Sequence, residues 1–167
     1  MDERIKTLQI SALSRINFCF KELKNSPPLK WINDVVDEGS LELSIQNYKN
    51  LTRAEQASFK KTLYEFLDRQ STTEARIMLI INYLSALLIE GRNNQISIHK
   101  NFENKMQEIR NFETENKDTL HNLKSARDKL YAHIDLDWQK YAKSITFDEF
   151  ECCIKFLNDL FDYRVFD

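Results

Sequence analysis

The scarcity of glycine and proline is the feature that most restricts what this chain can fold into. The sequence holds two residues of each type in 167 positions. A β-rich fold of this length requires many tight turns, which these two residue types usually supply. Apolar series with a spacing of three and four residues run through the sequence instead, as in helices that bury one face. We therefore expect an all-α fold.

Composition and charge predict one globular domain over residues 1–167. Apolar residues make up 42% of the chain and charged residues 30%, and the formal net charge is −2. This charge gives no global attraction to nucleic acid or to an anionic membrane, so an RNA-binding surface has to be local. The N-terminus lacks a signal-peptide pattern, and three cysteines without C-x-x-C spacing are typical of reduced thiols. We expect a cytoplasmic protein without membrane association.

Helix signals in the first half predict the start of an antiparallel bundle of four to five main helices, with short accessory helices. The first helix is expected over residues 2–24, a short helix over 28–36 and a turn over 37–40. Thr52-x-x-Glu55 and Ser71-x-x-Glu74 are capping boxes, which predict one helix to about residue 69 and then another. The second of these is apolar almost all round over 77–89, so we place it at the bundle centre. The stripe of the first helix consists of Ile5, Leu8, Ala12, Ile16, Cys19 and Leu23, widened by Leu13 and Phe20.

The second half of the chain predicts two more helices. A long polar helix is expected from about Ile98 to His133, with a break near 112–116. The capping box Thr146-x-x-Glu149 predicts the last helix. Its buried side chains are expected to be Phe150, Cys153, Ile154, Leu157, Leu160 and Phe161.

Arg127 occupies a position where the spacing of the long helix favours an apolar residue. The surrounding series Leu120, Leu123, Leu130 and Ile134 has a gap at this point. At about 100° per residue, Arg127 falls within about 20–30° of the centre of that stripe. A guanidinium stays charged and is costly to bury alone. We therefore expect one of two arrangements. Either a group on another helix accepts hydrogen bonds from Arg127, or Arg127 faces a site that binds an anion.

His133 follows Arg127 by six residues, and the two side chains suit RNA cleavage without a metal. A histidine can act as general base on a ribose 2′-hydroxyl, because its pKa lies near neutrality. An arginine can neutralise the charge that builds up on the phosphate. The products would be a 2′,3′-cyclic phosphate and a 5′-hydroxyl. No Walker loop, zinc spacing or serine elbow is present, and we predict no cofactor and no metal site.

The run Arg127-Asp128-Lys129-Leu130-Tyr131-Ala132-His133 resembles the motif of the HEPN superfamily (higher eukaryotes and prokaryotes nucleotide-binding), especially its abortive-infection-related branch. The resemblance implies a helical-bundle endoribonuclease in which Arg127 and His133 are catalytic and Asp128 orients them. It also implies a homodimer with both motifs in one composite cleft. A prokaryotic defence or toxin–antitoxin setting follows from the same resemblance, with an antitoxin or defence protein as partner.

The geometry of one helix separates the two catalytic candidates. Residues six apart lie about 120° apart around the axis and about 9 Å along it. Arg127 and His133 therefore converge only if the helix ends near His133 or a second protomer completes the site. We take the first helix and the long helix as candidates for the dimer interface.

Each candidate residue also has a structural interpretation that the sequence leaves open. Arg127 can pair with a carboxylate of another helix, and His133 can stabilise the negative end of its own helix. Lys124 and Lys129 either contact the phosphates of RNA or are solvated charges. A non-catalytic module that binds RNA, a nucleotide or a protein therefore remains the second prediction, and a plain structural bundle the third.

Two further features receive structural interpretations. Arg92 and His99 also fit the Arg/His spacing, but they lie around an expected loop, and we assign His99 no role. The adjacent Cys152 and Cys153 are interpreted as a pair of core residues rather than a redox site.

Overall fold

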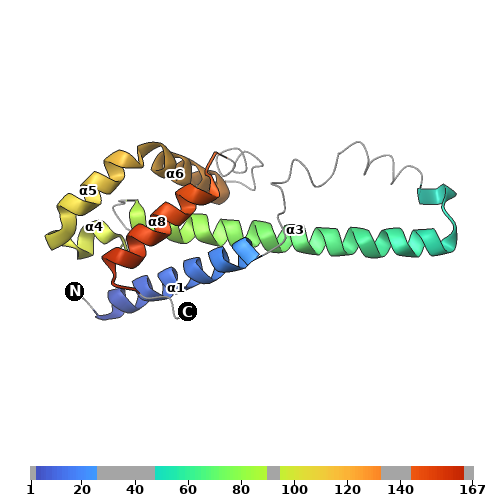
Figure 1. Ribbon diagram of the computed structural model, residues 1–167, viewed down its shortest axis with the longest axis horizontal. Coiled ribbons are helices and arrows are strands. Elements are labelled where there is room, and N and C mark those ends of the chain that lie inside the picture. Colours follow the sequence, from blue (N-terminus) through green and yellow to red (C-terminus); the bar gives the residue numbers. More distant parts are fainter. Residues whose placement is uncertain (1–2, 26–47, 90–94, 133–143, 164–167) are drawn as a thin grey trace. The chain divides into compact units, whose positions relative to one another are not determined.

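The computed structural model describes residues 3–25, 48–89, 95–132 and 144–163, and every regular element among them is helical (Figure 1). The expected all-α bundle is thus confirmed. The short helix and turn predicted over 28–40 lie outside the described residues. The elements are α1 (Glu3–Asn25), η2 (Tyr48–Asn50), α3 (Arg53–Leu88), α4 (Ile98–Asn101), η3 (Glu103–Lys105), α5 (Met106–Glu115), α6 (Lys117–Ala132) and α8 (Phe147–Leu160).

The chain forms two compact units, and the boundary between them falls within α1 and within α3. One unit consists of Met1–Lys21 and Ile77–Asp167, and the other of Glu22–Arg76. The larger unit carries α4, α5, α6 and α8 together with parts of α1 and α3, so it includes every described residue considered below as a site. None of the described helices combines the length and apolarity needed to cross a bilayer.

Helix α1 buries the predicted stripe except for its first two members, because Ile5 is only half-buried and Leu8 is exposed. Ala12, Ile16, Cys19 and Leu23 are buried as expected, but Leu8 is 50% exposed. Gln9 is fully buried in its place, and its Nε2 donates a hydrogen bond to the Ile96 carbonyl at 2.9 Å. At about 100° per residue, Gln9 lies much closer than Leu8 to the centre of the residues that α1 buries, so Gln9 faces the core at this turn. The Ile96 carbonyl satisfies the buried NH2 group of Gln9, whereas Gln9 Oε1 is buried without a hydrogen-bond partner among the described residues.

Helix α3 begins at its predicted capping box. The Thr52 backbone N–H donates to Glu55 Oε2 at 2.8 Å, and the Glu55 N–H donates to Thr52 Oγ1 at 3.4 Å. Hydrogen bonds from the Thr52 side chain and backbone lower the pKa of the Glu55 carboxyl. The second capping box, at Ser71, is wrong as a helix start, because α3 continues unbroken to Leu88. No glycine or proline lies between residues 53 and 88 to stop it.

The C-terminal part of α3 supplies much of the core, as predicted for 77–89. Burial does not extend around its whole circumference, however, since Leu79 is 40% exposed. The Ser85 hydroxyl donates to the Leu123 carbonyl of α6 at 3.3 Å, which joins these two helices inside the core. The buried apolar residues are Ile77, Ile80, Ile81, Leu84, Leu87 and Leu88.

The long polar helix predicted over 98–133 is wrong as a single element. The backbone leaves the helical region at Phe102 and again at Asn116, which separates α4, α5 and α6. The Phe102 ring packs edge-on against Phe161 with centroids 4.8 Å apart, a contact that the sequence pattern does not reveal. The break predicted near 112–116 is confirmed at Asn116, whose Nδ2 donates back to the Phe112 carbonyl at 2.9 Å.

Helix α8 follows its prediction closely and runs antiparallel to α1. Its capping box is complete, and Phe150, Cys153, Ile154, Leu157 and Leu160 are buried, while Phe161 is only half-buried. Ser14 and Asn17 of α1 bond to Tyr163 and Asn158, respectively, so that rising numbers on one segment meet falling numbers on the other. Phe156 stacks on Phe112 of α5 with ring centroids 3.9 Å apart.

Candidate functional site

Arg127 lies at the edge of the buried stripe of α6. Among the side chains of α6 that the structure describes, those buried fully or nearly so are Thr119, Leu123 and Ala126, whereas Leu120 is half-exposed. At 100° per residue, Arg127 is about 70° from the centre of that set. Its side chain is 25% exposed. The prediction that Arg127 fills the middle of the apolar stripe is therefore wrong, because the core contacts of Thr119 and Ala126 rotate the helix away from that orientation.

The Arg127 guanidinium is held by its sequence neighbour. Its Nε and Nη2 atoms both donate to Asp128 Oδ1, at 3.0 and 2.7 Å. The acceptor thus comes from the same helix, whereas the sequence predicted either an acceptor from another helix or an opening onto an anion. Charge-assisted bonds of this length fix the plane of a guanidinium. The Nη1 atom takes no part in these two bonds, and the side chain is partly exposed to solvent.

The other predicted site residues differ in exposure, and one of them lies outside the described residues. Lys124 is exposed one turn earlier on α6, and Lys129 is half-buried. His133 lies outside the described residues, as do the side chains of Leu130 and Tyr131. The structure therefore brings together Arg127 and Asp128, and the convergence of Arg127 with His133 stays a prediction.

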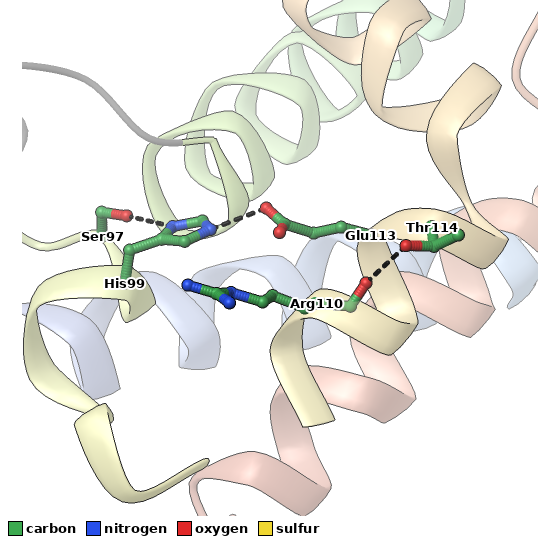
Figure 2. Close-up of polar contacts among 5 residues, drawn as sticks. All are labelled: Ser97, His99, Arg110, Glu113 and Thr114. Carbon is green, nitrogen blue, oxygen red and sulfur yellow. Dashed lines mark hydrogen bonds and ion pairs between the residues drawn. The ribbon is translucent and has the colours of Figure 1, made fainter. Parts of the chain in front are cut away.

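A second polar cluster, which the sequence did not reveal, centres on His99 of α4 (Figure 2). The His99 Nδ1 atom bonds to Ser97 Oγ at 2.9 Å, and Nε2 bonds to Glu113 Oε1 of α5 at 2.6 Å. The His99 side chain is 8% exposed and Glu113 35% exposed, while Ser97 is fully buried. Figure 2 also shows Arg110 of α5, whose backbone carbonyl accepts a hydrogen bond from the Thr114 hydroxyl at 2.8 Å.

Despite its residue types, this cluster is arranged as a structural tie. A serine, a histidine and a carboxylate can form a nucleophilic triad, but the nucleophile has to be reachable by substrate. Ser97 is inaccessible, and both imidazole nitrogens of His99 are already bonded. The arrangement fastens α4 to α5. Ser97 and His99 are neighbours in sequence, but only the fold brings in Glu113, so no local signal could have identified the cluster.

Glu149 joins the start of α8 to α6. Its carboxylate accepts hydrogen bonds from the Thr146 backbone at 2.6 Å, the Thr146 hydroxyl at 2.9 Å and the Thr119 hydroxyl at 2.7 Å. Partial burial raises the pKa of this carboxyl, but the bonds from Thr146 and Thr119 outweigh it, and the pKa lies below its ordinary value of 4.5. The Thr119 side chain is buried, and this contact gives its hydroxyl the hydrogen-bond partner that a buried polar group needs.

The two adjacent cysteines of α8 face different surroundings. Cys153 is buried, whereas Cys152 is exposed and its Sγ lies 3.7 Å from Asn116 Oδ1. The prediction of a core pair is therefore wrong for Cys152, because consecutive helical residues point about 100° apart. Burial, assisted by Cys152 and Glu149, raises the pKa of the Cys153 thiol to about 12. Cys153 is thus protonated and unreactive at neutral pH.

A shallow groove of about 530 Å³ runs over α5 and α8. Its floor includes the stacked rings of Phe112 and Phe156. The charged residues that line the groove are three carboxylates and one lysine, so the groove repels an anion such as a phosphate. The remaining lining residues are Asp148, Glu151, Cys152, Lys155 and Asp159.

Neither metal ligands among the described residues nor similar proteins assign a role to any residue of this chain. Among the side chains that the structure describes, no group of three or more histidine, cysteine, aspartate or glutamate residues could hold a metal ion. No protein-family model, no curated protein and no solved structure matches the chain.

Proposed function

We propose that this protein is a metal-independent endoribonuclease of the HEPN type, acting as a homodimer in a prokaryotic defence or toxin–antitoxin system. The observation that carries the proposal is the state of Arg127. Its guanidinium is oriented by Asp128 and remains partly open to solvent in an all-helical chain. The setting and the dimer come from the motif resemblance alone.

In this proposal His133 removes the proton of a ribose 2′-hydroxyl. The 2′-oxygen then bonds to the adjacent phosphorus, the bond from phosphorus to the 5′-oxygen breaks, and the leaving oxygen takes a proton from solvent. Arg127 stabilises the charge on the non-bridging oxygens as they pass through the transition state. Asp128 keeps the guanidinium in one plane, so less conformational freedom is lost when the phosphate binds.

The test is cleavage of a labelled RNA by the purified chain and its variants. We expect His133→Ala and Arg127→Ala each to lower the cleavage rate by about 100-fold or more, because each removes a group that acts in the transition state. EDTA should leave the wild-type rate unchanged, and the new ends should be a cyclic phosphate and a 5′-hydroxyl.

Matched controls come from residues of the same type outside the motif. His121 is exposed on α6 and Arg110 is exposed on α5, so His121→Ala and Arg110→Ala should cleave at the wild-type rate. If the His133→Ala and Arg127→Ala variants both cleave RNA at the wild-type rate, the proposed mechanism is disproved.

The second candidate is a helical module that binds its ligand without cleaving it. The contact between Asp128 and Arg127 favours this alternative, because the carboxylate offsets part of the charge that a phosphate would meet. Charge reversal at Lys124 and Lys129 separates the possible ligands. It should weaken binding of RNA strongly and leave binding of a protein partner at another surface unchanged.

A further inference from the structure

The outward face of α1 is basic in a chain whose net charge is negative. Within Glu3–Lys21 the exposed charged residues are four cations and one acid, whereas the formal charge of the whole protein is −2. This local excess is what a polyanion requires for binding to an otherwise acidic protein. The cations are Arg4, Lys6, Arg15 and Lys21, and the acid is Glu3; Glu22, the next charged residue of α1, is paired with Arg76 at 3.3 Å.

A large aromatic side chain lies in the middle of this basic face. Phe18 is 63% exposed, although the opposite side of α1 is packed in the core. Residues three apart on a helix are displaced by about 60° around the axis, so Arg15 and Lys21 flank Phe18 on its two sides. We call these three residues the α1 platform.

Arg15 is held in a defined position next to Phe18. Its Nη1 donates to the Tyr83 hydroxyl of α3 at 2.9 Å, and its Cζ lies 5.8 Å from the centroid of the Tyr83 ring. A guanidinium carries five N–H donors, and this bond uses one of them. The platform therefore offers a pre-positioned cation beside an exposed ring.

The charge of this face decides between possible occupants. In a two-fold dimer the same patch meets itself, so an α1–α1 contact would set like cations against one another. A membrane-surface helix needs its apolar face exposed, but the apolar side of α1 is buried against other helices. A flexible polyanion with flat apolar groups matches both the cations and the ring.

We propose that the α1 platform binds single-stranded RNA, with one base stacked on Phe18 and neighbouring phosphates bound by Arg15 and Lys21. This inference rests on the proposed function, because it names the surface that holds the substrate of the Arg127/His133 site. Stacking on an aromatic side chain accepts any base, so the platform predicts binding without strong sequence preference.

Binding can be measured separately from cleavage. A fluorescein-labelled single-stranded oligonucleotide methylated at every 2′-oxygen lacks the attacking hydroxyl, so the full-length wild-type chain can be titrated by anisotropy. We expect Phe18→Ala to weaken binding by about 5- to 100-fold, since one base loses its stacking partner. Lys21→Gln should lower the slope of log affinity against log salt by about 0.7, the value for one phosphate contact on a single strand.

The control removes exposed apolar area without a ring. Leu8 is 50% exposed on the same helix, and Leu8→Ala should change affinity by less than about two-fold. Circular dichroism and thermal melting should match wild type for all three variants, because the substituted side chains are largely outside the core.

The outcomes separate this inference from the proposed function. Phe18-dependent binding without cleavage of unmodified RNA would support the platform and contradict the nuclease. Cleavage and binding that are both unaffected by Phe18→Ala and Lys21→Gln would overturn the platform and leave the nuclease intact. Absence of any binding to the oligonucleotide, or a dimer that dissociates in Phe18→Ala while RNA affinity is unchanged, would also overturn it.

Discussion

The Arg127–Asp128 and His99–Glu113 pairs make different use of the same kind of interaction. The first joins adjacent residues of α6, with side chains 25% and 54% exposed. The second joins α4 to α5 across fourteen residues of sequence, with the imidazole 8% exposed. Only the second fastens two elements of the fold together, so a short contact to a carboxylate does not by itself indicate a structural role.

The contribution of each pair to the free energy of unfolding depends on how deeply it is buried and on whether it joins two helices. An exposed ion pair typically contributes about 0–1 kcal/mol to stability. A buried polar group that loses its partner costs about 1–3 kcal/mol. Stability therefore accounts for the contacts of His99, whereas the Arg127–Asp128 contact contributes little to stability, and in our proposal it orients Arg127 for a phosphate.

The largest effect on stability is expected from breaking the buried pair. His99→Ala should lower the free energy of unfolding by about 1–3 kcal/mol, because it leaves Ser97 and Glu113 without their partner and opens a cavity. Urea denaturation of His99→Ala and the exposed control His121→Ala measures this difference. An unchanged midpoint for His99→Ala would show that the cluster does not hold α4 to α5.

A second tie between elements, the carboxylate of Glu149, gives a smaller effect with a characteristic pH dependence. Glu149→Gln should cost about 1 kcal/mol at pH 7 through weaker capping and a weaker bond to Thr119. The pKa of Glu149 is lower in the folded state, so its contribution is complete at neutral pH and is lost as the pH falls below about 4.5.

The measurement for Glu149 is therefore a pair of denaturation series, at pH 7 and below pH 4. The stability difference between wild type and Glu149→Gln should shrink in the acidic series, because the protonated carboxyl resembles the amide. A difference that stays constant with pH would mean that the charge of Glu149 has no role in joining α6 to α8.

The smallest effect on stability is expected at the exposed pair. Asp128→Asn should change the free energy of unfolding by less than about 1 kcal/mol, since Asp128 is exposed and its contact with Arg127 lies within one helix turn. Thermal melting of the variant beside His99→Ala measures the contrast directly. A loss above 2 kcal/mol would place Arg127 and Asp128 in the fold and remove the argument that a ligand explains them.

Local signals were sufficient to predict most of the helical elements. The capping boxes at Thr52 and Thr146 and the buried face of α8 agree with the structure because each depends on residues within a few positions of one another. The same reasoning failed at Ser71, where an equally good box lies inside a helix. A cap sequence stops a helix only if the preceding residues do not continue it, and nothing before Ser71 interrupts α3.

The sequence by itself determined the all-α class, because two glycines and two prolines cannot supply the turns of a β fold, and it singled out Arg127 with Asp128 beside it. Only the tertiary structure decided how far each side chain is buried and which distant partner it meets. In the structure Arg127 lies at the edge of the core and Phe18 is exposed on α1. Glu113 bonds to His99, fourteen residues earlier in the sequence. The physical reason is that periodicity specifies a helix face only approximately, whereas its final orientation depends on packing against elements far away in the sequence.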